Sequence, residues 1–216
     1  MELIRVDTKR AYEVIHDQII TLELAPGISI NEGKIAAQLG MGLAPIREAI
    51  KLLVHDHLVE VTSTGLFVSD VKIKDLEQIS EMRLLLEPYC VQQTAKLATA
   101  DDFLVLDALC NEQSLVPPDQ PRVLIELDHK FHQAIARAAD NKFLAETLEH
   151  FFTLSKRLWF LALPHLEFLP AAVESHLELT AAIKARDEQS AEKIMRQHIQ
   201  DFYNQVFEIL QKLESQ

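Results

Sequence analysis

The stretch that decides the fold is LAPGISINEGKIAAQLGMGLAPIREAIKLLVHDHLVEV, residues 24–61. Asn31 is a good N-cap for a short helix that Gly40 closes. A short turn then leads to a further helix over residues 43–56. Pro45 is tolerated in that helix because the missing N–H falls in the first turn, where it has no helical partner. Two helices joined by a tight turn that contains glycine predict a helix-turn-helix.

The residues on either side complete a larger unit. Residues 8–24 show one apolar face at helical spacing, so we expect a helix there that Pro26-Gly27 ends. Downstream, two short apolar runs, Leu58–Val61 and Leu66–Val68, flank Ser63-Thr64-Gly65, a pattern that predicts a β-hairpin. Three helices followed by such a hairpin are typical of a winged helix. We therefore expect a winged helix-turn-helix domain over residues 1–70.

Beyond residue 70 the strand signals end and only helical patterns remain. Each pattern has a single apolar face, which favours packing into an all-α bundle of six or seven helices. The predicted fold class is therefore mainly α, with a winged helix-turn-helix over 1–70 and an all-helical domain over 71–216. The expected helices cover residues 73–99, 101–114, 121–139, 141–163, 168–186 and 188–213.

Four residues able to bind a metal lie on inward-facing stripes of these helices. Asp128 and His132 share one face, one turn apart, and His176 and His198 lie on the apolar stripes of two further helices. A single buried histidine is commonplace. Four such groups are better explained by convergence on one ion, because a buried carboxylate needs a partner. Three nitrogens and one oxygen suit zinc, nickel, manganese or a similar divalent ion, with open positions for water or a ligand.

The bulk composition excludes several classes of protein. The net charge of −12 over 216 residues argues against a nonspecific polyanion binder, though a local basic patch is possible. Cys90 and Cys110 form no CxxC pair, which favours a reducing cytoplasm. The first ten residues lack the apolar core of a signal peptide, and the most apolar segment, residues 158–173, is too interrupted to span a bilayer. We expect a cytoplasmic protein without a membrane partner.

Together with the helix-turn-helix, the segments EMRLLLEP (81–88), DHKFHQAIARAADN (128–141) and HLELTAAIKARD (176–187) make the chain similar to GntR-type transcriptional regulators. More narrowly, the chain resembles the FadR subfamily, whose C-terminal domain is an all-helical effector-binding bundle. The order Asp, His, His, His matches the metal-binding members. The resemblance thus implies that Asp128, His132, His176 and His198 bind a metal.

The chain departs from the family pattern in the expected DNA-binding domain over residues 1–70, called the head below. Gly42, Leu43 and Ala44 stand where members carry Ser/Thr-Arg-Thr, and Leu43 cannot hydrogen-bond a base edge or a phosphate. Gly33 replaces an arginine of the second helix, and Thr64 replaces an arginine of the wing. Residues 1–70 hold six basic against ten acidic side chains, a balance of −4. We expect weak DNA binding, or good binding only as a dimer on a closely matched site.

The expected DNA contacts come from the helix-turn-helix and the wing. Arg47 and Lys51 either form a solvated helix face or contact phosphate, and the helix-turn-helix favours the second interpretation. The residues expected to contact DNA are Lys34, Pro45, Arg47, Lys51, Thr64 and Gly65.

Arg83 has two open interpretations. It either forms an ion pair with Glu87, one turn on, or binds the carboxylate of an effector inside the bundle. Trp159 is expected in the core. The remaining histidines do not form an inward-facing group of possible ligands and are excluded from the site. They are His16, His55, His57, His129, His150 and His165.

The function expected from these observations is a ligand-responsive transcriptional regulator and not an enzyme. It would be a homodimer that binds a double-stranded DNA operator, acts as a repressor, and responds to a small organic acid bound at the metal, with Arg83 as a second anchor. Two alternatives stay open. One is a regulator-derived protein with weakened DNA binding that acts through protein contacts. The other is a metalloenzyme, for which the sequence offers no clear general base.

Overall fold

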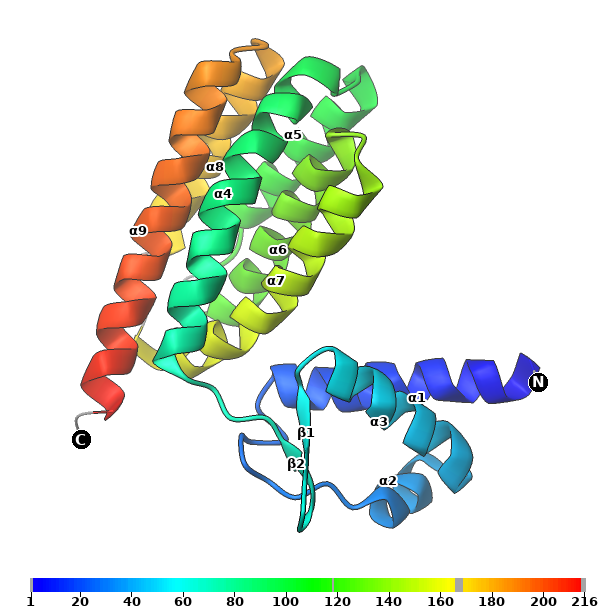
Figure 1. The fold of residues 1–216 in the computed structure, drawn as a ribbon. Coiled ribbons are helices and arrows are strands. Elements are labelled where there is room, and N and C mark those ends of the chain that lie inside the picture. Colours follow the sequence, from blue (N-terminus) through cyan, green and yellow to red (C-terminus); the bar gives the residue numbers. More distant parts are fainter. Residues whose placement is uncertain (1, 118, 166–168, 215–216) are drawn as a thin grey trace. The chain divides into compact units, whose positions relative to one another are not determined.

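The structure is a computed structural model that describes residues 2–117, 119–165 and 169–214. The predicted break at Pro118 and the predicted first residue of the helix over 168–186 lie outside the described residues. The chain divides into two compact units, Met1–Lys72 and Ile73–Gln216. No helix within the described ranges combines the length and the apolar character needed to cross a membrane. The helices and strands of both units are shown in Figure 1.

The first unit is a winged helix-turn-helix. It consists of α1 (Glu2–Ile20), α2 (Glu32–Leu39), α3 (Leu43–His55), β1 (Val59–Thr62) and β2 (Gly65–Val68). The core lies between α1 and α3, where Ile15 and Ile19 of α1 and Ile46 and Leu53 of α3 are fully buried. This hydrophobic contact places the outer face of α3 in solvent, which is the arrangement that a DNA-reading helix requires.

Two details of this unit differ from the sequence prediction. The first helix begins earlier than residue 8 and ends at Ile20, because Leu22 adopts a left-handed conformation with φ 63° that no helix can continue. The wing also pairs with the segment before α2: the Val68 N–H donates to the Ile28 carbonyl, and the Ile30 N–H donates to the Leu66 carbonyl of β2. The strands β1 and β2 pair antiparallel as predicted, with Val59 opposite Val68.

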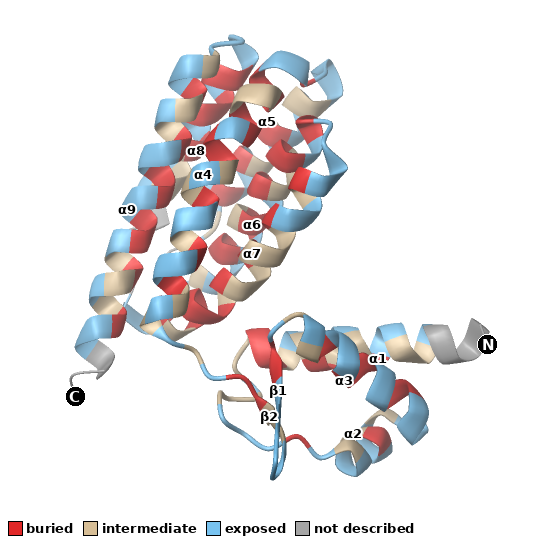
Figure 2. Cartoon of the chain, viewed as in Figure 1, coloured by how far each residue is buried: buried red, intermediate tan, exposed pale blue. Residues whose placement is uncertain are grey.

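The second unit is an all-α bundle, so the predicted fold class is confirmed. In the described residues it contains six α-helices and one short 3-10 turn. They are α4 (Ile73–Leu97), α5 (Ala100–Ser114), α6 (Pro121–Ala138), α7 (Lys142–Ala162), the 3-10 turn (Leu163–His165), α8 (Leu169–Lys184) and α9 (Glu188–Glu214). Figure 2 shows buried residues on the inward faces of the helices and exposed residues on their outer faces.

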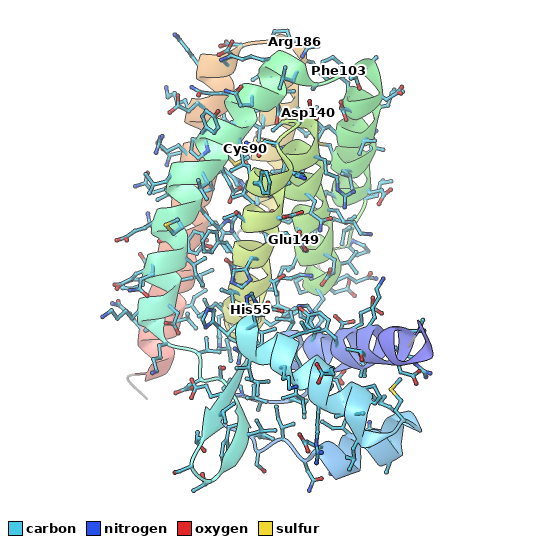
Figure 3. All side chains as sticks on the ribbon, turned by 45° about the vertical axis from the view of Figure 1, so that its right-hand side comes forward. His55, Cys90, Phe103, Asp140, Glu149 and Arg186 are labelled. Atoms are coloured by element: carbon cyan, nitrogen blue, oxygen red, sulfur yellow. The ribbon has the colours of Figure 1, made fainter. Side chains whose placement is uncertain are left out.

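Helix α4 is the centre of the bundle, because it packs against α6, α7, α8 and α9. It continues through Pro88, whose ring removes the N–H that would bond to the carbonyl of Leu84. Arg196 of α9 supplies the missing donor, with its Nη1 3.2 Å from that carbonyl oxygen. Arg186 donates to the carbonyl of Ala95 in the last turn of α4 and to that of Ala98 just after the helix, and it lies over the ring of Phe103 at one end of the bundle (Figure 3).

Candidate metal centre and DNA-binding surface

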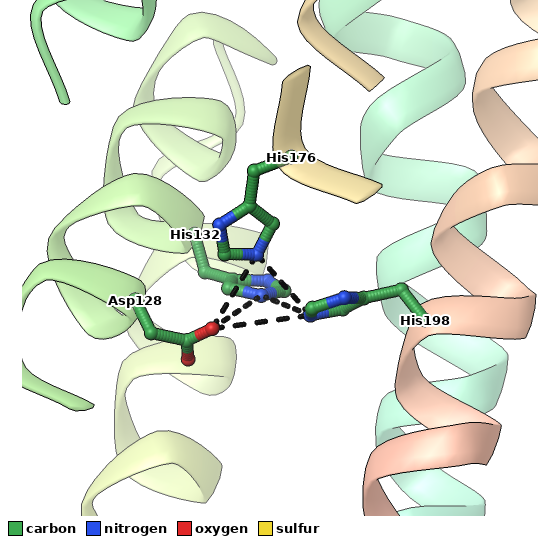
Figure 4. A group of neighbouring side chains, drawn as sticks. All are labelled: Asp128, His132, His176 and His198. Carbon is green, nitrogen blue, oxygen red and sulfur yellow. Dashed lines mark hydrogen bonds and ion pairs between the residues drawn. The ribbon is translucent and has the colours of Figure 1, made fainter. Parts of the chain in front are cut away.

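The four predicted metal ligands meet inside the bundle. Asp128 and His132 lie one turn apart on α6, His176 comes from α8 and His198 from α9 (Figure 4). One ligand atom from each residue lies within 4.8 Å of every other. The three histidines are buried and Asp128 is nearly so. The periodicity of three separate helices therefore predicted a real spatial cluster.

The spacing of these atoms suits a single ion. The Nε2 atom of His198 lies 3.2 Å from that of His132 and 3.3 Å from that of His176. The Asp128 carboxylate oxygen Oδ1 lies 3.4 Å from Nε2 of His176 and 3.9 Å from Nε2 of both other histidines. Nitrogens bound to one metal at ~2.1 Å, at angles between octahedral and tetrahedral, lie about 3.0 to 3.4 Å apart. The imidazoles thus already hold the separation that shared coordination produces.

Hydrogen bonds on the far side of two imidazoles fix which nitrogen carries the proton. His132 Nδ1 lies 2.6 Å from Oε2 of Glu87, and His176 Nδ1 lies 2.8 Å from Oε1 of Gln113. Both oxygens accept hydrogen bonds, so each Nδ1 is the donor. With Nδ1 protonated, the neutral imidazole presents an Nε2 lone pair to the centre of the cluster.

The third imidazole has the same tautomer, for a different reason. The Ser175 hydroxyl donates its only hydrogen to the carbonyl of Ala172, at 2.7 Å. Its oxygen is therefore left to accept from Nδ1 of His198, also at 2.7 Å. When all three imidazoles are neutral, three Nε2 lone pairs consequently face one another in a buried space without a hydrogen between them. A cation at their centre would remove this repulsion, so the donor set fits a divalent metal.

Glu87 connects the centre to a buried arginine. Of the two interpretations left open for Arg83, the structure shows the ion pair, because its Nε donates to Glu87. Its Nη1 donates to the hydroxyl of Tyr203 at 3.2 Å, and its guanidinium lies 3.9 Å from the ring centroid of Phe152. Arg83 is only 2% exposed. Glu87 is buried as well, and the same carboxylate that pairs with Arg83 also accepts the hydrogen bond from His132.

The electrostatics of the centre favour neutral histidines. Burial, together with the neighbouring His132 and Arg83, lowers the pKa of His198 to about 3. Burial and the two neighbouring imidazoles also lower the pKa of His176 well below its usual value. Burial alone would raise the pKa of Glu87, but Arg83 and His132 outweigh it and hold that pKa at about 2. The imidazoles of His176 and His198 are therefore neutral at neutral pH and available for coordination, and the Glu87 carboxylate is ionised.

The pKa of the carboxylate in the cluster, that of Asp128, is shifted upward. Burial raises the pKa of Asp128 above its ordinary value, only partly offset by His132 and Arg83. A carboxylate in this position needs a positive neighbour to remain charged. A bound divalent ion would supply that charge.

Two cavities lead toward the centre. A cavity of about 560 Å³ between α8 and α9 is lined by Ser175 and His198 and by the charged side chains of Glu178, Lys193 and Asp201. A second cavity, of about 380 Å³, opens between α6 and α7 and reaches His132. Both volumes lie within the range of small-molecule sites. Each cavity is therefore lined by one histidine of the cluster, His198 in the first and His132 in the second.

The other histidines stay outside the cluster, as the sequence analysis expected. His129 is closest in sequence, but its Nε2 lies 2.9 Å from Oε2 of Glu149 and its ring stacks on Phe152. Sequence reasoning missed three residues that orient the ligands: Glu87, Gln113 and Ser175. Each is a polar residue on a largely buried helix face, a weak signal that does not say which histidine the residue would contact.

The three basic side chains of α2 and α3, Lys34, Arg47 and Lys51, are exposed, but two of them are paired. Nε of Arg47 is 3.0 Å from Oε2 of Glu32, and Nζ of Lys51 is 2.7 Å from Oε1 of Glu48. Lys34 is exposed on α2. These acidic partners compete with DNA phosphate for the two cations of α3.

Of the remaining residues expected to contact DNA, two are exposed and one is buried. Thr64 and Gly65 lie exposed at the tip of the wing, where a hydrogen bond from the Thr64 N–H to the Thr62 hydroxyl shapes the turn. Pro45 is buried in the first turn of α3. Its expected role as a DNA-contacting residue is therefore wrong: its fixed backbone dihedral starts the helix instead.

Comparison with known proteins agrees with this two-part architecture. The family described as "Bacterial regulatory proteins, gntR family" matches residues 7–68, and the FCD domain matches residues 78–201. The transcriptional repressor RspR of Escherichia coli K12 is 23% identical over 206 residues, which cover 94% of this chain and 90% of RspR. The structure of E. coli McbR/YncC has a TM-score of 0.81 at 22% identity, covering 94% of this chain and 97% of McbR. The metal-free FCD domain of TM0439 has a TM-score of 0.56 at 16% identity, covering 67% of this chain and 99% of that domain.

The chain therefore belongs to the GntR family of bacterial regulators, in the group that carries an FCD domain. The resemblance stated from the sequence is confirmed. The relatives and the matching folds are transcriptional regulators and not enzymes, which removes the metalloenzyme alternative. The chain is a transcriptional regulator, and regulators of this family bind DNA operators.

The low histidine pKa values predict how the metal-free protein responds to pH. Unfolded histidines take up protons near pH 6.5, whereas folded His198 does so only at about 3. Below about pH 6.5 the unfolded state therefore binds more protons, so the stability present above that pH is lost as the pH falls. After chelation, the free energy of unfolding in urea should fall by about 1.4 kcal/mol per pH unit for each such histidine. His198→Asn should give a shallower slope, and an unchanged slope in this variant would contradict the assignment.

Proposed function

We propose that this regulator controls transcription from a double-stranded DNA operator in response to a small carboxylate that binds at a metal in its FCD domain. The observation that carries the proposal is the convergence of three Nε2 lone pairs and one carboxylate in the bundle of a chain with a winged helix-turn-helix. The head over residues 1–70 would contact DNA, and the bundle over 71–216 would bind the metal and effector and form the dimer.

Asp128, His132, His176 and His198 would hold the metal. Three imidazole nitrogens and one carboxylate oxygen suit zinc, nickel or manganese. When bound, the ion would supply a positive charge and open coordination positions for an anionic ligand. Outside this first layer, Glu87, which is ionised and hydrogen-bonded to His132, would hold one ligand in the correct tautomer.

A small organic acid is the effector class that this centre supports. One carboxylate would neutralise the positive charge left when a divalent ion is bound by the single carboxylate of Asp128. The cavity between α8 and α9 offers room for the rest of the molecule. Arg83 would serve as a second anchor through the guanidinium N–H groups that neither Glu87 nor Tyr203 occupies.

Regulation would follow from a homodimer with two heads that reach half-sites about one helical turn apart. The effector changes DNA affinity only if it binds two arrangements of the heads unequally. We propose that the chain acts as a repressor, and the name of the relative RspR, a transcriptional repressor, supports this direction.

One alternative keeps specific support. Leu43 and Ala44 at the start of α3, the ion pairs of Arg47 and Lys51, and the balance of −4 in residues 1–70 all weaken attraction to phosphate. A chain with such a head could act through protein contacts instead. Selection of binding sites from random DNA by the full-length protein distinguishes the two functions, since only an operator-binding regulator enriches a sequence.

Metal analysis and thermal melting test the proposed centre. The purified protein should contain about one divalent ion per chain and melt earlier after chelation, because metal binding contributes folding free energy. A carboxylate ligand at 100 times its Kd should raise the stability by about 2.7 kcal/mol. His176→Ala and His198→Ala should each lower bound metal and abolish this shift. His129→Ala, a buried histidine outside the cluster, should retain both. If chelation alters neither the melting temperature nor ligand binding, the metal proposal is wrong.

The outer carboxylate gives a second test. Glu87→Gln keeps an acceptor oxygen for His132 but removes the negative charge, so metal affinity should fall by about 10- to 100-fold. Competition with a fluorescent chelator measures the affinity. The matched control is Glu149→Gln, which alters the same kind of hydrogen bond at His129, outside the cluster. Equal affinities in both variants would mean that Glu87 does not orient the site.

The head is tested by salt dependence. If Arg47 contacts phosphate, Arg47→Ala should weaken binding to all DNA sequences alike and lower the slope of log K against log salt by ~1. Arg10→Ala makes the same change of net charge at an exposed position of α1 and should leave the slope nearly unchanged. A loss of discrimination at a single base pair with an unchanged slope would show that Arg47 reads a base instead.

A further inference from the structure

The outer face of α3 begins with aliphatic side chains. Leu43, the first residue of the helix, is 43% exposed, and Ala44 beside it is exposed as well. The N-terminal residues of the recognition helix are those that reach base edges in a helix-turn-helix complex. The positions of this head best placed to touch bases therefore present methyl groups and no hydrogen-bonding group.

The cations of the same helix are less free to read bases. Arg47 is held by Glu32 of α2, and Lys51 by Glu48 of α3 itself. Recognition of guanine by either side chain would compete with its acidic partner. The polar groups of α3 are thus directed to their own neighbours, and its exposed aliphatic groups stay available.

Among the base edges in the major groove, the C5-methyl group of thymine is the one that an aliphatic side chain complements. We propose that Leu43, with Ala44, recognises thymine methyl groups in each operator half-site. This inference rests on the proposed operator binding and names the base chemistry that the head selects. It also accounts for an exposed leucine on a face that would otherwise gain nothing from it.

The surroundings of Leu43 favour DNA over a protein partner. Gly42 precedes the helix without any side-chain cap, and a Cβ atom added there would meet no atom within 4 Å. The first N–H groups of α3 therefore remain open to a phosphate oxygen beside the groove. Arg47 and Lys51 follow on the same exposed face. An apolar tip beside open backbone N–H groups matches a major groove and its phosphates better than an apolar protein surface.

Replacement of thymine by deoxyuracil tests the proposal, because it removes only the methyl group. The full-length protein first selects an operator from random DNA. Each thymine of that operator is then replaced in turn, and Kd is measured at fixed salt. At one or two positions per half-site, Kd should rise about four-fold, which corresponds to ~0.8 kcal/mol for one buried methyl group. The Leu43→Ala variant should show this penalty reduced toward one-fold at the same positions.

Leu52→Ala is the matched control. Leu52 lies on the same helix and is 49% exposed, but it is far from the N-terminus of α3. This variant should retain the full deoxyuracil penalty. Enrichment of an operator without any sensitive thymine, or a penalty that persists in Leu43→Ala, overturns the inference while the regulator function stands. If no DNA sequence is enriched and Leu43 is instead protected by a protein partner, both proposals fall.

Discussion

The convergence of three imidazole Nε2 atoms at one buried point is the constraint that ties the helices of the bundle to one another. The Nε2 atoms of His132 and His176 lie 3.2 and 3.3 Å from that of His198. The opposite nitrogens donate to acceptors on α4, α5 and α8. The rings themselves come from α6, α8 and α9. One small centre therefore fixes the relative positions of five helices, and a cation that binds it would tie them together more strongly.

The ion pair between Arg83 and Glu87 is better understood through this centre than as a source of stability. Taking two charges out of water costs about as much as their attraction returns, so such a pair adds little by itself. Here the carboxylate has a second task, since it accepts the Nδ1 hydrogen of His132. Arg83 keeps that carboxylate ionised in a buried site, and Tyr203 and Phe152 hold Arg83 in turn. The orientation of the His132 imidazole therefore depends on Arg83, Tyr203 and Phe152 as well as on Glu87.

Periodicity explains how much of this could be predicted from the sequence. Asp128 and His132 are one turn apart, so their shared face follows from helical geometry alone, and the stripes of His176 and His198 point them inward. The contact between Gln113 and His176 could not be predicted in this way, because the two residues lie on different helices and their meeting depends on how α5 packs on α8. The ion pair of Arg47 with Glu32 also joins two helices. Sequence patterns specify faces of single elements, whereas the partners across an interface follow from packing.

The weak electrostatics of the head bear on how regulation would work. A head with a balance of −4 and paired cations would gain little from phosphate neutralisation, so we expect one head alone to hold DNA poorly. In a dimer, the second head binds as an intramolecular step, and affinity depends on whether both half-sites are reached at once. A change in the spacing of the heads would then remove most of the affinity. The coupling needed from an effector is correspondingly small, about 1–3 kcal/mol, which lies within the range of allosteric proteins. In the proposed dimer, weak single-head contacts would make the dimer geometry, and through it the metal centre, the point at which DNA binding is controlled.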